Sequence, residues 1–438
     1  MSDDSSAAEV TLREVARSWA PLAASWLLMS FEVPMISAVV ARLVDPEVHL
    51  AAYGGVVFPI ALVVEAPIIM MLTASTALSR DRASYQSLRL FNHKLSAVLT
   101  AIHALLAFTP LFDRLLVPLL DVPAPVIEPA RIGLGIMLPW TWAIASRRFN
   151  QGALIRFGRA RDVGYGTAVR LCTGVLVLAC GFALGGPGIV VATVTVAAGV
   201  LAEAAFAGLR ARAVVRRMEP GDPSRALRGL PFLRFYMPLA LTPLVTMIAQ
   251  PIGAAAITRM PHALESLAAW PALSGVVFLL QSPAFALSEV VVATLGRPGA
   301  PQVLRRFAWI LTLSITAVAV LLVATPLARL WFGDVTGLRP ALTAMAVSAL
   351  IVSTPMPGAR GLQSWYQGVL VHAHRTTALG ESVVVFLVVS VIGLAIGVGL
   401  GTVTGLVVAS AVFAAARLSE TAWLWLRSRR LRAALLRG

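Results

Sequence analysis

Residues 30–43 read Ser30-Phe31-Glu32-Val33-Pro34-Met35-Ile36-Ser37-Ala38-Val39-Val40-Ala41-Arg42-Leu43 and lie in an apolar segment long enough to cross a bilayer. The interior of this segment holds a carboxylate, Glu32, and a proline, Pro34. A charge near the middle of a membrane helix costs at least about 2.5–3.5 kcal/mol, so by default it faces a cavity and serves a function. Pro34 also frees backbone groups beside the acid. The simpler alternative is a Glu32 that pairs inside a helix bundle for packing alone; we favour a function.

The same pattern occurs twice in the chain, at a nearly fixed spacing of 217 or 216 residues (for example, 238 − 21 = 217). The matched pairs are Pro21 and Pro238, Pro34 and Pro251, Arg42 and Arg259, Leu50-Ala51-Ala52-Tyr53 and Leu267-Ala268-Ala269-Trp270, Arg80 and Arg297, Thr109-Pro110-Leu111 and Thr325-Pro326-Leu327, Pro139 and Pro355, Gln151-Gly152 and Gln367-Gly368, Gly188 and Gly405, Glu203 and Glu420, and Arg210-x-Arg212 and Arg427-x-Arg429. Pairs that keep their order across the whole chain predict two homologous halves.

The composition indicates a protein whose main solvent is lipid. Hydrophobic residues make up 58% of the chain and charged residues 13%, and the mean hydropathy is +0.82. A soluble domain averages about 25% charged residues. Only helices or closed barrels satisfy their backbone groups in lipid, and apolar runs of roughly 20 residues are too long for barrel strands. We therefore predict an all-α integral membrane protein.

The formal net charge of +15 is concentrated in alternate loops. The arginine-rich loops include Arg80 to Lys94, Arg147 to Arg161, Arg210 to Arg234, Arg297 to Arg306, Arg375, and Arg427 to Arg437. This positive-inside pattern places both termini in the cytoplasm and predicts a multi-pass protein of the cell inner (plasma) membrane. The excess of basic over acidic residues then sets the orientation in the membrane and attracts anionic lipid headgroups, and we expect no nucleic-acid partner.

About twelve transmembrane helices are predicted. They lie near 16–42, 48–79, 90–110, 125–153, 162–184, 188–216, 231–259, 264–296, 303–325, 338–370, 376–399 and 402–430. These spans divide the chain into an N-terminal six-helix lobe (1–218), a polar cytoplasmic linker (219–230) and a C-terminal six-helix lobe (231–438). Because each half has an even number of spans, the two six-helix repeats are parallel, and a cleft can open between the lobes.

Three acids in the predicted spans match uncharged residues at the corresponding positions of the other half of the chain. Glu32 matches Ala249, Glu65 matches Ser282 or Gln281, and Glu289 matches Leu72 or Thr73. Each of these acids can simply pair with a nearby arginine or a backbone donor. Three unmatched acids exceed what packing usually needs, so we interpret Glu32, Glu289 and Glu65 as candidates for ion coupling or gating.

Basic and amide side chains supply candidates for binding an anion. Arg360 and Arg147 follow the matched prolines of their spans and break the internal symmetry, and a guanidinium offers a planar fork of donors that suits phosphate or carboxylate. Gln250, Asn150 and Gln363 complete the predicted substrate-binding set. The alternative for Arg147 and its neighbour Arg148 is that they snorkel to the cytoplasmic headgroups.

No catalytic constellation is present in the sequence. It contains no Walker-type loop, no His-Glu-x-x-His and no nucleophile elbow. We therefore predict a protein that is not an enzyme and has no cofactor or metal, so that any transport uses an ion gradient or the substrate's own gradient.

The repeat and its motifs carry a resemblance to a known family. The twelve-span parallel repeat resembles the multidrug and toxic compound extrusion (MATE) fold. More specifically, several short motifs resemble the progressive ankylosis (ANK) family of the MATE-like superfamily: Glu32, Arg42 and Leu50-x-x-Tyr53-Gly54, Ser79-Arg80-Asp81-Arg82, Gln250-Pro251-Ile252 running to Arg259, Pro283 with Ser288-Glu289, and Pro355-x-Pro357 with Gly368. The chain departs from that family in lacking a long cytoplasmic tail and in having Gln250 where a basic residue is expected.

The resemblance implies export of small polyanions such as pyrophosphate, nucleotide or citrate. We accordingly predict a monomeric secondary active transporter that works by alternating access, with a proton or sodium ion as a possible coupling partner. The first alternative is a proton- or sodium-coupled exporter of cationic drugs. A flippase for lipid-linked precursors and a non-transporting membrane scaffold or receptor are the others.

Overall fold

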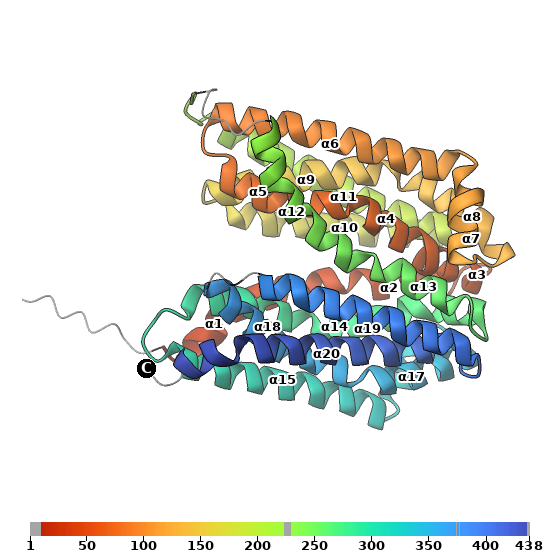
Figure 1. Ribbon diagram of the computed structural model, residues 1–438. Helices are drawn as coiled ribbons and strands as arrows, with labels where there is room; N and C mark the ends of the chain where they lie inside the picture. Colours follow the sequence, from red (N-terminus) through yellow and green to blue (C-terminus); the bar gives the residue numbers. More distant parts are fainter. Residues whose placement is uncertain (1–9, 223–228, 374, 376, 436–438) are drawn as a thin grey trace, which may run out of the picture. The chain divides into compact units, whose positions relative to one another are not determined.

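The computed structural model describes residues 10–222, 229–373, 375 and 377–435, and all regular secondary structure within these residues is helical (Figure 1). The first half of the chain forms α1 (Leu12–Ser30), α2 (Glu32–Val40), α3 (Pro46–Ala51), the π-helical η1 (Ala52–Val57), α4 (Phe58–Ile69), α5 (Met71–Leu78), α6 (Arg82–Phe108), η2 (Phe112–Leu116), α7 (Val117–Leu120), α8 (Ala124–Ile136), α9 (Leu138–Arg156), α10 (Ala160–Ala183) and α11 (Gly188–Val215).

The second half repeats this order. It forms α12 (Gly229–Met247), α13 (Ala249–Ile257), α14 (Ala263–Thr294), α15 (Ala300–Ala324), α16 (Leu327–Leu330), the π-helical η4 (Trp331–Val335), α17 (Pro340–Ser353), α18 (Pro355–His372), α19 (Thr377–Leu400) and α20 (Gly405–Leu435). In the described residues, ten helical stretches are long and apolar enough to cross a membrane. The stretches α8–α9 and α12–α13 complete the twelve, so the predicted all-helical fold is confirmed.

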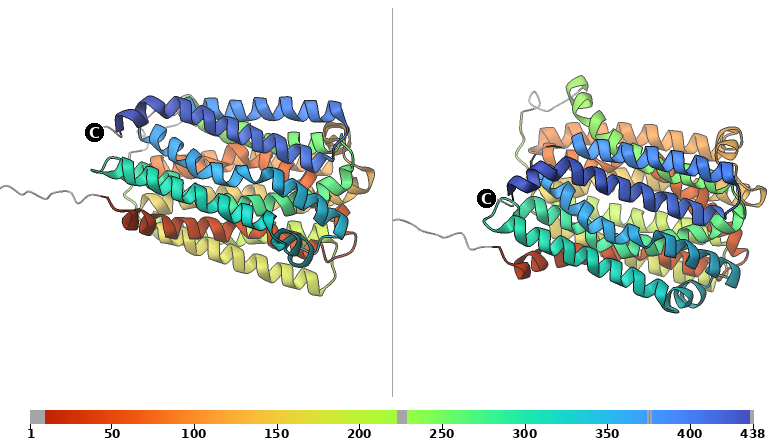
Figure 2. Two further views of the ribbon diagram at one scale, coloured as in Figure 1. Left: turned by 90° about the horizontal axis from the view of Figure 1, so that it is seen from below. Right: turned by 60° about the horizontal axis from the view of Figure 1, so that its bottom comes forward.

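The helices group into two compact units. Unit 1 comprises the described residues of Met1–Pro34 and Ala272–Gly438, and unit 2 comprises those of Met35–Pro271. The boundaries fall inside α2 and α14. Both views of Figure 2 show the blue helices α19 and α20 of unit 1 running side by side. The predicted lobes 1–218 and 231–438 remain a prediction, and residues 223–228 of the predicted linker lie outside the described residues.

Matched threonines end α6 and α15, the third membrane span of each repeat, in the same way. Thr109 Oγ1 donates to the carbonyl of Leu105 at 2.6 Å, and Thr325 Oγ1 donates to the carbonyl of Leu321 at 2.7 Å. Both threonines have extended backbones, with φ −118° and ψ 169° for Thr109 and φ −118° and ψ 170° for Thr325. The internal repeat therefore extends to individual hydrogen bonds.

Matched aromatic residues bind the carbonyls of matched prolines. In unit 1, Trp19 Nε1 of α1 donates to the carbonyl of Pro283 on α14 at 2.9 Å. In unit 2, Tyr236 Oη of α12 donates to the carbonyl of Pro67 on α4 at 2.5 Å. The donors are 217 residues apart (236 − 19 = 217) and the acceptors 216 (283 − 67 = 216). The first helix of each repeat thus packs against the second span of the other repeat.

The third membrane span, α6, begins earlier than predicted because it has a well-formed N-cap. Asp81 Oδ1 accepts from the backbone N–H of Ser84 at 2.8 Å, and Ser84 Oγ accepts from the backbone N–H of Asp81 at 3.1 Å. These hydrogen bonds hold the pKa of the Asp81 carboxyl below its usual range. The cap starts α6 at Arg82, eight residues before the predicted start near 90 (90 − 82 = 8).

Two matched glycines allow close helix contacts, and the first gives a test of the fold. A Cβ on Gly152 would lie 2.4 Å from the carbonyl oxygen of Leu72, and a Cβ on Gly368 would lie 3.2 Å from that of Ser288, again 216 residues on (288 − 72 = 216). We expect Gly152→Ala to destabilise the protein by about 1–3 kcal/mol through overpacking, as measured by unfolding in detergent. Gly164→Ala, where a Cβ meets nothing within 4 Å, is the matched control. Equal stability of the two variants would contradict this packing.

Candidate functional site

Arg360 of unit 1 is a partly buried guanidinium without a carboxylate partner. It lies on α18, and its Nη1 donates to Oε1 of Gln363 at 2.9 Å, one turn further along the helix. Its guanidinium carbon lies 4.4 Å from the centre of the Phe285 ring on α14, a cation–π contact. Within the described residues Arg360 forms no ion pair, and its Nε has no hydrogen-bond acceptor.

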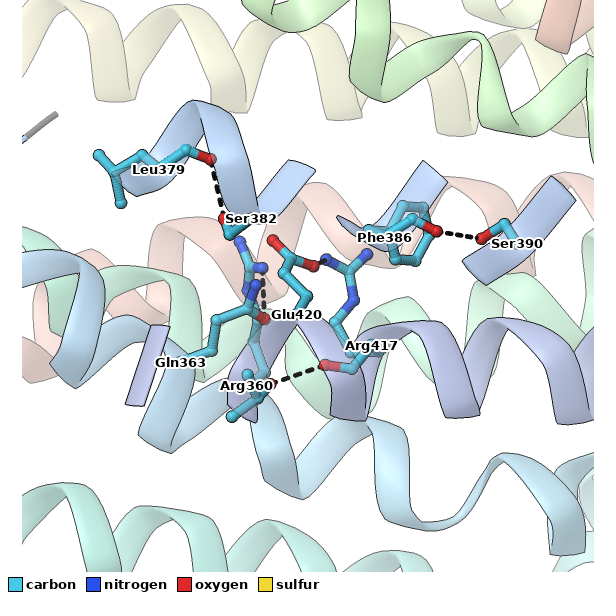
Figure 3. Close-up of polar contacts among 9 residues, drawn as sticks. Arg360, Gln363, Leu379, Ser382, Phe386, Ser390, Arg417 and Glu420 are labelled. Atoms are coloured by element: carbon cyan, nitrogen blue, oxygen red, sulfur yellow. Dashed lines mark hydrogen bonds and ion pairs between the residues drawn. The ribbon is translucent and has the colours of Figure 1, made fainter. Parts of the chain in front are cut away.

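A second guanidinium and a carboxylate of α20 lie close to Arg360. Arg417 Nη1 pairs with Oε2 of Glu420, whose side chain is 4% exposed, and the Arg417 guanidinium packs on the ring of Phe386 from α19. Figure 3 shows Arg360 and Gln363 turned toward the helix that carries this pair. The charges of Arg417 and Glu420 both act on Arg360. Glu420 is therefore paired with Arg417, and the charge of Arg360 has no carboxylate of its own among the described residues.

Several polar atoms of this cluster are buried and lack a partner. Among the described residues these include Nε of Arg360, Nε of Arg417 and Nε2 of Gln363, and the Gln363 side chain is fully buried. Donors without acceptors inside a protein cost free energy, because nothing replaces the water that they lose. The cluster of Arg360, Gln363, Arg417 and Glu420, here called the Arg360 cluster, is chemically suited to an anionic guest with acceptor oxygens.

Unit 2 contains a buried charge cluster at the matching place in the first repeat. Arg147 Nη1 of α9 donates to Oε2 of Glu203 on α11 at 2.6 Å, and their side chains are 6% and 1% exposed. Gln151 Nε2 donates to the other carboxylate oxygen at 2.9 Å. Arg170 of α10 lies 3.9 Å from Glu203. The alternative that Arg147 snorkels to the headgroups is therefore wrong, because its side chain turns inward to a carboxylate.

Glu65 and Arg148 border this cluster. Glu65 of α4 is 5% exposed, and Arg148 of α9 is half-buried. Each acts electrostatically on the other. Asn150 lies apart from Glu203: its Oδ1 accepts from the Tyr85 hydroxyl at 3.3 Å, and its Nδ2 donates to the carbonyl of Ser146.

The structure brings together only part of the predicted site. Arg360 and Gln363 lie together in unit 1, and Arg147 and Glu65 lie in one charged region of unit 2. Glu32 is half-buried, whereas Glu289 and Gln250 are exposed. The roles predicted for these side chains, including Asn150, remain predictions.

The sequence analysis did not select the carboxylates at the centre of the two clusters. Glu203 and Glu420 were matched at an offset of 217 (420 − 203 = 217) but served only as markers of the repeat. Both are buried and ion-paired. An acid kept at the same place in both halves of a membrane protein was itself a usable signal, since such acids are costly. Arg170 was missed because only the packing of α10 against α11 brings it to Glu203, whereas Arg417 lies three residues before Glu420 on one helix and was within reach of sequence reasoning.

Comparisons with known proteins place this geometry in a known fold. No protein-family model matches the chain, and no curated protein matches its sequence. A solved structure described as the inward-facing conformation of a multidrug resistance MATE family transporter of the MOP superfamily has a TM-score of 0.73 at 15% identity, over 97% of this chain and 99% of its own. The chain has the MATE transporter fold.

Other solved structures that are similar to this chain carry different functions in their descriptions. Lipid II flippase MurJ, in an inward closed conformation, has a TM-score of 0.73 at 14% identity, over 94% of this chain and 87% of its own. A MOP superfamily transporter from Pyrococcus furiosus has a TM-score of 0.64 at 14% identity, over 98% and 99%. Its description states that reverse polarity of the binding pocket suggests a different function. The narrower resemblance to the ankylosis family stays a prediction.

Proposed function

We propose that this chain is a secondary active transporter that exports small anions, such as pyrophosphate, nucleotide or citrate, by alternating access. The observation that carries the proposal is Arg360, a guanidinium inside a helical unit that forms no ion pair among the described residues. A buried cation without a counterion is costly, so a site of this kind is stabilised by an anion from outside. The MATE fold supplies the context of a membrane transporter.

The proposal gives the predicted residues distinct roles. Arg360 binds the anion, with the Gln363 amide orienting its guanidinium and Arg417 adding positive charge. Arg147 positions the neighbouring charges, because its own charge is matched by Glu203. Glu32 and Glu289 remain the proposed coupling or gating acids, and Gln250 and Asn150 the proposed polar lining. We place the protein in the cell inner membrane as a monomer with both termini in the cytoplasm.

A multidrug exporter of cationic compounds is the second candidate, because Glu289 is exposed and one similar structure is described as a multidrug resistance MATE family transporter. A cation-binding site, however, does not need the charge of Arg360, which has no carboxylate of its own among the described residues. A flippase, as in MurJ, is a further alternative with the same fold.

Flux measurements separate these candidates. Purified protein is reconstituted in liposomes, and uptake of labelled pyrophosphate, ATP and citrate is compared with that of a cationic dye. We expect saturable flux of at least one anion and none of the dye, with reduced anion flux for Glu32→Gln. Dye flux without anion flux would favour the multidrug exporter, and unchanged anion flux in Glu32→Gln would remove Glu32 from the mechanism.

A further inference from the structure

Glu65 is a buried acid that lacks the partners such a group needs. Its side chain is 5% exposed, yet it forms no hydrogen bond and no ion pair with any described residue, and its Oε2 is buried without a donor. Arg148, on the facing helix α9, likewise forms no hydrogen bond or ion pair in the part of the chain that the structure describes. Two opposite charges on packed helices therefore act on each other with no hydrogen bond or ion pair between them.

The groups that face Glu65 define the charge of this region. Arg147 and Arg148 from α9 and Arg170 from α10 all act on it electrostatically. On α12, the titratable Tyr236 hydroxyl is directed at the carbonyl of Pro67 instead. Arg147 and Arg170 both form ion pairs with Glu203, whereas Arg148 forms none with any described residue.

A cation is a poor ligand for a site made of Glu65 and Arg148. Sodium requires several oxygen ligands and a negative field, whereas the charges of three guanidiniums act on this single carboxylate. An oxyanion, in contrast, offers acceptors to the unused donors of Arg148. An oxyanion beside an ionised Glu65 would place two negative charges together, and two such groups that share a site retain a proton.

We propose that unit 2 holds an anion site of its own, in which Arg148 binds an oxyanion and Glu65 takes up one proton with it. This inference rests on the proposed function and deepens it by naming the coupled ion. A hydronium ion of the solvent gives its proton to one Glu65 carboxylate oxygen, so that one O–H bond of the hydronium breaks, one carboxyl O–H bond forms and water is left. The protonated carboxyl then donates a hydrogen bond to the anion instead of repelling it. One proton and one oxyanion are therefore bound together.

The test uses sulfate, whose charge does not change near neutral pH, so that any pH dependence arises in the protein. Sulfate binding to the purified full chain is measured by calorimetry at several pH values. We expect one class of site whose affinity rises up to about tenfold for each unit by which the pH is lowered, the limit for one proton per anion. Glu65→Gln, whose amide resembles the neutral acid, should bind sulfate with no pH dependence at this site.

Two further variants identify the site. Arg148→Gln should lose the pH-dependent class of sites, whereas Arg360→Gln should keep it. The control is Glu128→Gln, which removes a carboxylate that is 71% exposed on α8. If Glu65→Gln does not fold in detergent, Glu65→Asp keeps the titrating group and should retain the pH dependence. A pH slope unchanged in Glu65→Gln, or intact pH-dependent binding in Arg148→Gln, would overturn the proposal.

The outcome is separable from that of the proposed function, because binding is measured without transport. Sulfate binding that follows this pattern in a protein without anion flux would contradict export but not the site. Anion flux in a protein without pH-linked sulfate binding would contradict only the role of Glu65 and Arg148.

Discussion

Replacing Arg360 with glutamine is expected to lower the apparent affinity for the transported anion by roughly 10- to 150-fold. Hydrogen bonds to charged groups contribute about 1.5–3 kcal/mol, and each 1.4 kcal/mol corresponds to about a tenfold change in affinity. Arg360 has no carboxylate among the described residues to take over its charge, so the loss falls on the bound anion. Arg360→Lys should recover only part of the function, because an ammonium keeps the charge but lacks the planar fork.

The measurement is the concentration dependence of labelled pyrophosphate, ATP or citrate uptake in proteoliposomes. Arg306→Gln is the matched control, since it removes an exposed guanidinium from α15 of the same unit. Full activity in Arg360→Gln would exclude Arg360 as the binding group. A gain of cationic dye transport in the same variant would instead favour the multidrug exporter.

Removing the carboxylate of Glu203 is expected to destabilise unit 2 by about 3–5 kcal/mol, because Glu203→Leu leaves Arg147 buried and unpaired. The two side chains are 1% and 6% exposed, and their ion pair measures 2.6 Å. The double variant Arg147→Met with Glu203→Leu should recover much of this stability, since an apolar pair of similar volume replaces a buried ion pair at little cost. Recovery should be incomplete, because Gln151 loses its acceptor as well.

Chemical unfolding of the purified variants in detergent gives these differences. Glu128→Leu removes an exposed carboxylate of the same unit and should change stability little. A double variant no more stable than Glu203→Leu alone would show that Arg147 does not depend on Glu203.

The helices and the repeat were predictable because their signals are local or periodic. Long apolar runs mark the spans, and prolines such as Pro67 and Pro139 lie close to the breaks between α4 and α5 and between α8 and α9. Arg360 and Gln363 were also within reach of sequence reasoning, since residues three apart share a helix face. Each of these features depends on only one segment of the chain.

The charge clusters required information that one segment does not contain. The partner of Arg147 is Glu203, 56 residues away on another helix, and only the packing of α9 against α11 brings them together. The sequence analysis also favoured acids that differ between the halves, whereas Glu203 and Glu420 are matched and central. Matched residues can be part of a shared buried charge network as well as of the scaffold.

The two aromatic donors to proline carbonyls have a consequence for the origin of the chain. Trp19 fixes the first helix of the first repeat to α14 of the second repeat, and Tyr236 fixes the first helix of the second repeat to α4 of the first. Neither repeat is complete without a helix from the other. An ancestor with a single repeat would have satisfied this requirement as a domain-swapped dimer, in which two identical subunits exchange their N-terminal helices.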